Sequence, residues 1–262
     1  MKSKYKLHLG NTKTVLDEMI NRNEKIDMIF TSPPYFAFRK NYSGNSDGEV
    51  GSIHVDDYAD WFLEFTEKFL QVLKPNGSFF LNINEKIDNG VVHPVLDELK
   101  YKMRKQGWYL VAKPYIWFKK QCMPTNCKYR AIDRYEYVFH FSNSTKPKFR
   151  AENCRVPHSA TTKKRMKPFH VELAEWFVKV GSDEGDTVLD PFAGSSTTGV
   201  AALKHNRNFI GIDLIDFNIN FGEKRIQHLL STGECYIPKN KLEKYGIDVN
   251  YYKVKGKHIN NP

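Results

Sequence analysis

One stretch in the last third of the chain constrains the fold more than any other. Thr187–Leu189 is an apolar strand that ends in Asp190, and the small residues after it open a helix. A second apolar strand over 208–212 ends in another acid, Asp213. This order predicts an α/β sheet in which the loop lets a ligand approach the backbone and the second acid accepts ribose hydroxyls.

The residues of this loop also restrict the ligand. The spacing is not G-x-G-x-x-G, and no Lys-Ser or Lys-Thr pair follows, so a loop that cradles phosphates is not predicted. Asp190 would repel a pyrophosphate. A ligand that carries sulfonium and ammonium groups suits this acid better.

A second motif follows the buried strand that is predicted over 26–30. Its sequence is Thr-Ser-Pro-Pro-Tyr, and the prolines end the strand because neither can donate to a ladder. In open α/β sheets, ligands bind at this carboxyl edge. The plain alternative is a strand end with a packing tyrosine. The residues assigned to catalysis are Ser32, Pro33, Pro34 and Tyr35.

Together the two motifs resemble those of the beta-group DNA amino-methyltransferases, in which the catalytic motif precedes the cofactor motif. The similarity covers about residues 7–230. The stretch 190–199 resembles the cofactor loop in its Asp-Pro-Phe-x-Gly-Ser-x-Thr-Thr form, with Ser196 where glycine is commoner. The resemblance implies S-adenosylmethionine as the cofactor, double-stranded DNA as the partner, and no metal.

The resemblance also implies a set of cofactor-binding residues. In the family, the position of Asn11 faces adenine, although a simple turn asparagine is an equal alternative. Lys167 opens a predicted helix through residue 180 that packs under the methionine end of the cofactor in the family. The full set is Asn11, Thr31, Lys167, Asp190, Pro191, Phe192, Gly194, Ser195, Ser196, Thr197, Asp213 and Leu214.

The charge of the chain favours a polyanionic partner. The net charge is +10 and the pI is about 9.2. Three loops concentrate basic residues: 36–55, which is predicted to be a mobile lid, 119–134, and 142–167, a short segment for target recognition. The alternative is a solvated basic surface. The residues assigned to DNA are Arg39, Lys40, Lys128, Arg130, Arg134, Lys163, Lys164 and Arg165.

The alternation of predicted strands and helices defines the fold class. It favours a Rossmann-like, doubly wound, mostly parallel α/β sheet that ends in an antiparallel hairpin of the segments 108–118 and 135–141. The methyltransferase domain is predicted over 1–230, with a basic tail over 231–262. Tyr35 and Asp190 are expected to meet across a topological switch point.

The target atom is inferred from the residue before Pro-Pro-Tyr. Family members with serine there mostly act on the N4 amine of cytosine, and those with aspartate mostly act on the N6 amine of adenine, which stays the alternative. Cytosine C5 methylation is disfavoured because the chain has no Pro-Cys pair. A second alternative, from another functional class, is a non-catalytic DNA-binding module that senses the cofactor.

The remaining features concern the setting of the protein. No run of apolar residues is long enough to span a membrane, and the four cysteines are interpreted as reduced thiols, so a cytoplasmic, nucleoid-associated protein of prokaryotic type is expected. The sequence leaves open whether a cognate restriction endonuclease accompanies the protein and whether it forms a homodimer. The recognition sequence is not encoded in any motif.

Overall fold

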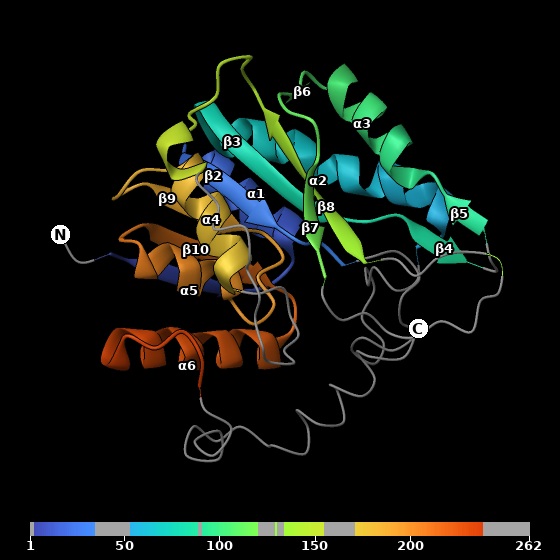
Figure 1. Ribbon diagram of the computed structural model, residues 1–262. Helices are drawn as coiled ribbons and strands as arrows, with labels where there is room; N and C mark the ends of the chain where they lie inside the picture. The colour runs from blue at the N-terminus through green and yellow to red at the C-terminus, as the bar shows by residue number, and fades with distance from the viewer. Residues whose placement is uncertain are drawn as a thin grey trace.

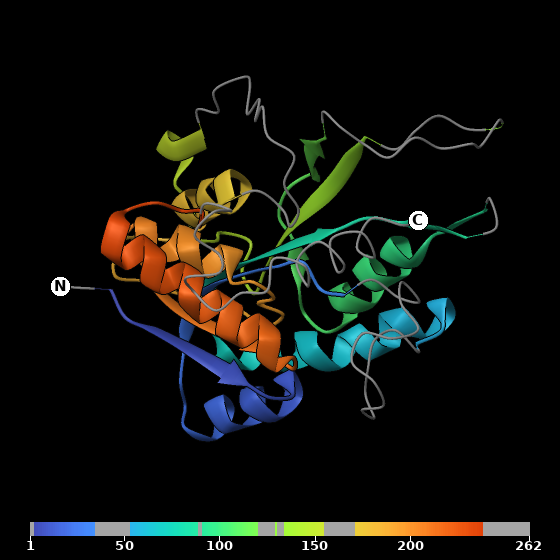
Figure 2. The ribbon, with the colours of Figure 1, turned by 90° about the horizontal axis from the view of Figure 1, so that it is seen from below.

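The computed structural model describes residues 3–34, 53–88, 91–119, 129, 134–154 and 171–237. They form an eight-stranded sheet with helices on both faces, as Figure 1 and Figure 2 show. The strands are β1 (Tyr5–Leu9), β2 (Ile26–Thr31), β3 (Leu73–Ile83), β6 (Tyr109–Leu110), β7 (Tyr115–Phe118), β8 (Tyr135–Ser142), β9 (Thr187–Asp190) and β10 (Asn208–Asp213). A separate hairpin joins β4 (Lys86–Asp88) and β5 (Val91–His93).

The helices divide evenly between the two faces of the sheet. They are α1 (Thr12–Asn21), α2 (Tyr58–Val72), α3 (Val95–Lys105), α4 (Val171–Gly181), α5 (Thr197–Lys204) and α6 (Asp216–Thr232), with short 3-10 turns at Val55–Asp57 and Ala151–Cys154. Helices α1 to α3 cover one face and α4 to α6 the other (Figure 2). Strand β2 is buried along its whole length because both its faces are covered.

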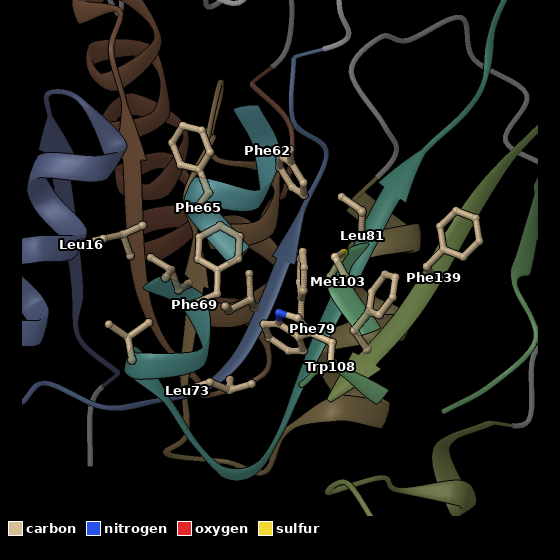
Figure 3. Close-up of a cluster of buried hydrophobic side chains, with 14 of the residues drawn as sticks. Leu16, Phe62, Phe65, Phe69, Leu73, Phe79, Leu81, Met103, Trp108 and Phe139 are labelled. Carbon is tan, nitrogen blue, oxygen red and sulfur yellow. The ribbon is translucent and has the colours of Figure 1, made fainter. Parts of the chain in front are cut away.

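The larger core lies beneath α2, whose apolar residues recur at helical spacing. Phe62, Phe65 and Phe69 share one face of this helix and are almost fully buried. Phe69 meets Phe79 of β3 edge to face, with ring centroids 5.3 Å apart (Figure 3). Burying each such ring contributes about 1.5–3 kcal/mol, so this cluster fixes α2 against the sheet.

The strand order places the two predicted motifs side by side. The order is β1-β10-β9-β2-β3-β8-β6, and β7 pairs with the other end of β8. After β2 the chain crosses to the α2 face, whereas after β9 it crosses to the α5 face. The carboxyl ends of these adjacent parallel strands therefore flank a topological switch point, and the predicted doubly wound fold is confirmed.

One predicted strand was wrong. The aromatic run over 108–118 forms two short strands instead of one, since the chain leaves the ladder between Leu110 and Tyr115. Pro114 stands in this break and has no N–H to donate. Both pieces still pair antiparallel with β8, so the predicted hairpin of β7 and β8 is present.

The part of the basic segment 142–167 that the structure describes does not reach the catalytic edge. Because β8 runs antiparallel, it ends beside Ser78, near the amino ends of the parallel strands. There Lys148 contacts Asp186 at 2.6 Å, and Arg150 binds both carboxylate oxygens of Asp183, at 2.6 and 2.5 Å. Lys148 and Arg150 are thus ion-paired within the chain, and DNA contact by the rest of this segment stays a prediction.

The boundary predicted at residue 230 falls inside a helix. Helix α6 continues to Thr232 and ends at Gly233, whose positive φ of 76° is a common helix stop. The chain then turns back to α4, where the Tyr236 hydroxyl donates to Glu172 at 3.1 Å. Among the described residues, no helix is long and apolar enough to cross a membrane.

Candidate active site

The turn after β2 is held by its neighbours on both sides. Thr31 is fully buried, Ser32 and Pro34 are half-buried, and Pro33 is buried. The hydroxyl of Tyr58, a fully buried residue at the start of α2, donates to the Pro34 carbonyl at 3.0 Å. The Pro34 carbonyl is therefore occupied, and the Pro33 carbonyl is the candidate acceptor of the turn.

Asp190 ties this turn to the loop after β9. Its Oδ1 accepts from the Thr31 hydroxyl at 2.7 Å and from the Phe192 N–H at 3.2 Å, and its Oδ2 accepts from the Thr198 hydroxyl at 2.6 Å. Thr31 and Asp190 are 159 residues apart in the sequence. The Asp190 carboxylate therefore holds the turn after β2, which carries the predicted catalytic residues, next to the predicted cofactor loop after β9.

This arrangement differs from the expectation that Asp190 faces a cationic ligand. Its side chain is only 1% exposed, and both oxygens are already bonded within the chain. Burial raises the pKa of Asp190 to about 6, against the smaller opposing effect of its three hydrogen bonds. In this structure Asp190 therefore positions Thr31, Phe192 and Thr198, and its predicted contact with the cofactor stays a prediction.

Asp213 ends β10 beside the same loop and shapes it from the other side. Its Oδ2 accepts from the Gly194 N–H at 2.8 Å, and its Oδ1 accepts from the Ile215 N–H and the Asn218 amide, each at 2.9 Å. Burial raises the pKa of this carboxyl. A carboxylate has about four lone-pair sites, so one remains for a ligand hydroxyl.

The other predicted loop residues are mostly occupied in building the loop. The Pro191 carbonyl accepts from the Thr12 hydroxyl at 2.7 Å, and the Phe192 ring packs against Phe65 of α2 at 5.2 Å. Ser196 has a left-handed φ of 56°, and its buried hydroxyl has no partner. Asn11 caps α1 by accepting from the Lys13 N–H at 2.9 Å, which matches its turn alternative.

Comparison with known proteins identifies the family of this chain. A model of the DNA methylase family, whose name covers N6 and N4 methylases, matches residues 26–170 and 161–223. The matched regions include both strand ends that Asp190 joins. The chain belongs to the DNA methylase family. The predicted resemblance to amino-methyltransferases is thereby confirmed.

Individual relatives cover most of this DNA methylase. The type II methyltransferase M.SmaI of Serratia marcescens is 26% identical over 78% of this chain and 85% of its own length. The structure of the PvuII cytosine-N4-specific DNA methyltransferase is 22% identical, covers 95% of this chain and 94% of its own, and superposes with a TM-score of 0.73.

The cofactor of this DNA methylase is S-adenosylmethionine. A protein of Thermus thermophilus, described as a DNA modification methylase and solved in complex with S-adenosyl-L-methionine, is 25% identical. It covers 87% of this chain and 97% of its own, with a TM-score of 0.64. The described residues hold no cluster of three or more His, Cys, Asp or Glu side chains suited to a metal.

The residues at this edge fit an adenosyl group. Leu9 and Leu214 are exposed apolar side chains at the ends of the neighbouring strands β1 and β10, where Leu9 pairs in register with Asp213. At Gly194, which has a φ of 50°, an added Cβ would meet no atom within 4 Å. Apolar surface, a carboxylate and an open loop thus adjoin one another.

Four residues in or beside the site were not assigned from the sequence. Tyr58 and Thr198 resemble ordinary helix residues, and their roles appear only when the strands are ordered. Asn82 lies on β3, next to β2, and its buried Oδ1 has no partner while its amide donates to the Tyr137 carbonyl at 3.0 Å. Arg225, the fourth, contacts the cofactor loop from behind.

Several predicted residues lie outside the described part of the chain, and their roles stay predictions. They are Tyr35, Arg39, Lys40, Lys128, Arg130, Lys163, Lys164, Arg165 and Lys167. Arg134 is described and exposed, and its carbonyl accepts from the Lys119 N–H at 2.6 Å at the loop end of the β7–β8 hairpin. Its position at the carboxyl edge is compatible with the predicted DNA contact.

Replacing Asp213 by alanine is expected to weaken binding of S-adenosylhomocysteine by about 1.5–3 kcal/mol, the range for a hydrogen bond to a charged group. Loss of the Gly194 contact would add to the effect. Isothermal titration calorimetry measures it, with the exposed Asp216→Ala variant as the control. Unchanged affinity in a folded Asp213→Ala protein would remove this residue from the site.

Proposed function

We propose that this DNA methylase transfers a methyl group to the N4 amine of cytosine in duplex DNA. The observation that carries the proposal is the Thr31–Asp190 hydrogen bond, since it fixes Ser32 beside the cofactor loop. The type II methyltransferase relatives support a role as the modification enzyme of a prokaryotic, cytoplasmic restriction–modification pair.

The reaction requires activation of a weak nucleophile. The lone pair of an exocyclic amine is delocalised into the ring, and acceptors at its N–H groups favour the tetrahedral geometry that frees it. We assign this role to the Ser32 hydroxyl and the Pro33 carbonyl. S-adenosylmethionine, when bound, offers the electrophilic methyl group on its sulfonium.

Positioning then supplies much of the rate. The new N–C bond forms in line as the S–C bond breaks, an amine proton passes to solvent, and S-adenosylhomocysteine remains. The base must first leave the duplex, which costs a few kcal/mol. Stacking on Tyr35 would return about 1–3 kcal/mol. No covalent enzyme intermediate is required, in keeping with the absence of a cysteine in the turn.

Two indications favour cytosine over adenine. Serine precedes the Pro-Pro pair in this chain, as in the family members that mostly act on cytosine N4. A neutral hydroxyl can accept from the amine and donate to cytosine N3, but adenine N1 offers the same arrangement, so the family tendency carries this preference. The PvuII DNA methyltransferase, whose fold this chain shares, is cytosine-N4-specific. Adenine N6 remains the competing product that an experiment has to test.

The product is expected to be N4-methylcytosine. DNA from cells that express the protein would be digested to nucleosides and analysed by mass spectrometry, with an empty-vector strain as the background. N6-methyladenine as the sole new nucleoside would overturn the cytosine assignment. No new methylated nucleoside, together with no turnover of labelled cofactor on mixed DNA, would favour the non-catalytic alternative.

Ser32→Ala is the matching test of the chemistry. The amine becomes cationic as the methyl group arrives, so loss of a charge-assisted hydrogen bond worth about 1.5–3 kcal/mol slows transfer about 10- to 150-fold. Affinity for S-adenosylhomocysteine should stay near wild type. Ser231→Ala, on the exposed end of α6, is the control. A wild-type rate in Ser32→Ala would show that the chemistry is not built on this turn.

A further inference from the structure

Arg225 contacts the cofactor loop through three hydrogen bonds. It lies on α6, is only 6% exposed, and its Nη1 donates to the Ser195 carbonyl at 2.6 Å. The same nitrogen lies 2.9 Å from the hydroxyl of Ser195 and 2.9 Å from that of Thr197. The guanidinium also lies over the Phe221 ring at 6.0 Å. A planar, permanently charged group thus fixes the two loop residues from behind.

This contact determines what the Ser195 hydroxyl can do. A guanidinium has donors only, so the oxygen of Ser195 must accept from it. The hydroxyl hydrogen then has to point away from Arg225. Ser195 is therefore left as a hydrogen-bond donor, polarised by the adjacent cation.

The acidic residues around the cofactor loop make a ligand carboxylate the group that most needs such a donor. Asp190 and Asp213 are both acidic and flank the loop, and the charge of Asp213 disfavours a second negative charge at Asp190. A ligand carboxylate would meet the same repulsion. Arg225 is a buried cation that contacts the loop between them, so it can offset this field where Ser195 donates.

We propose that Arg225 is a positioning residue that turns the Ser195 hydroxyl into a donor for the carboxylate at the methionine end of the cofactor. The adenosine end is handled separately, by Asp213 and the apolar side chains at the ends of β1 and β10. The inference rests on the use of S-adenosylmethionine and is independent of which base is methylated.

The test compares two ligands that share an adenosyl thioether and differ at one end. S-adenosylhomocysteine carries the amino-acid group, and 5′-methylthioadenosine lacks it. Calorimetry on Arg225→Gln should show at least a tenfold loss of affinity for S-adenosylhomocysteine and less than a twofold change for 5′-methylthioadenosine. Lys224→Gln, one residue away on α6, should bind both ligands as wild type does.

A double-mutant cycle adds a readout that a purely structural role would not give. If Arg225 acts through Ser195, then Ser195→Ala should show the same ligand selectivity, and the double variant should be no weaker than the weaker single variant. Equal losses for both ligands would overturn the proposal and leave Arg225 as a general support of the loop. Unchanged affinity for both ligands would also overturn it.

Arg225→Lys covers the case in which Arg225→Gln does not fold. Lysine keeps the charge, but its side chain is one bond shorter than that of arginine, so its ammonium falls short of the three oxygens that Nη1 contacts. A selective loss for S-adenosylhomocysteine of threefold or more would support the positioning role, and a loss shared by both ligands would contradict it. Thermal unfolding of each variant shows that folded protein is compared.

Discussion

Asp190→Ala is expected to reduce methyl transfer by at least a hundredfold and to cost about 3–5 kcal/mol of unfolding free energy, since three buried donors lose their acceptor at about 1–3 kcal/mol each, offset in part by relief of the buried charge. The carboxylate binds the Thr31 and Thr198 hydroxyls and the Phe192 N–H in a buried site. Alanine leaves all three donors unpaired and releases the catalytic turn from the cofactor loop. Denaturant unfolding and a labelled-methyl assay measure the two effects.

Asp190→Asn separates the shape of this network from its charge. Asparagine fills the same space, and one threonine hydroxyl can reverse its role to accept from the new amide. We therefore expect this variant to fold, with transfer reduced less than in Asp190→Ala. Equal activity in Asp190→Ala and the wild type would show that the hydrogen bonds of Asp190 are not needed for catalysis.

The difference in unfolding free energy between wild type and Asp190→Asn is expected to depend on pH. The pKa of Asp190 is about 6 in the folded chain, above its ordinary value of 3.8. Folding therefore favours the protonated acid, and the favourable contribution is present below about pH 4 and is lost as the pH rises through about 6. The unfolding free energy of wild type relative to Asp190→Asn should fall by roughly 2–3 kcal/mol over that window. A flat difference would mean that Asp190 titrates normally.

Gly222→Ala is expected to destabilise the protein by about 1–3 kcal/mol and to weaken cofactor binding, although it adds only one methyl group. A Cβ at this position would lie 2.2 Å from the Ser196 hydroxyl oxygen and 3.0 Å from the Ser196 Cβ. The hydroxyl could turn aside, but the Cβ could not, so α6 or the cofactor loop would have to move. Thermal unfolding and calorimetry with S-adenosylhomocysteine measure the change.

Ser196→Gly should rescue Gly222→Ala. It removes the clashing atoms, a buried hydroxyl without a partner and a side chain in the left-handed region, at a φ of 56°. Alone it should raise stability by about 1 kcal/mol, since left-handed geometry costs non-glycine residues about 1–2 kcal/mol. If the double variant is as unstable as Gly222→Ala, the two residues are not matched to each other.

The sequence was sufficient for most of the fold because its signals were local. Two prolines after an apolar run located the end of β2, and aromatic residues at helical spacing located α2. The order of the motifs predicted the switch point, which the strand order confirms. The predicted meeting of Tyr35 with Asp190 there stays a prediction, because Tyr35 lies outside the described residues. The prediction of one strand over 108–118 was wrong because alternating aromatic residues are compatible with one strand or with two. Only the pairing with β8 decides between these possibilities.

The site was less predictable because its contacts join distant segments. Asp190 and Arg225 have roles set by hydrogen bonds to partners that no local pattern reveals. The sequence does not show whether an acid is buried or exposed. Asp190 was therefore expected to contact the ligand directly, because it stands at the end of a strand that borders the site. The same limit applied to Lys148 and Arg150, whose acidic partners Asp186 and Asp183 follow more than thirty residues later.

The order of strands in the sheet also governs how the protein can be made. Strand β2 pairs on one side with β3, which follows soon after it, but on the other side it waits for β9. During synthesis the growing chain therefore carries an unpaired strand edge from the first part of its length until residues 187–190 emerge. Such an edge can pair with another chain. Pairing of this kind depends on closing a long loop and is intrinsically slow. The contact that assembles the active site is thus also among the last that the nascent chain can form, and an incomplete chain carries the catalytic turn without the loop that serves it.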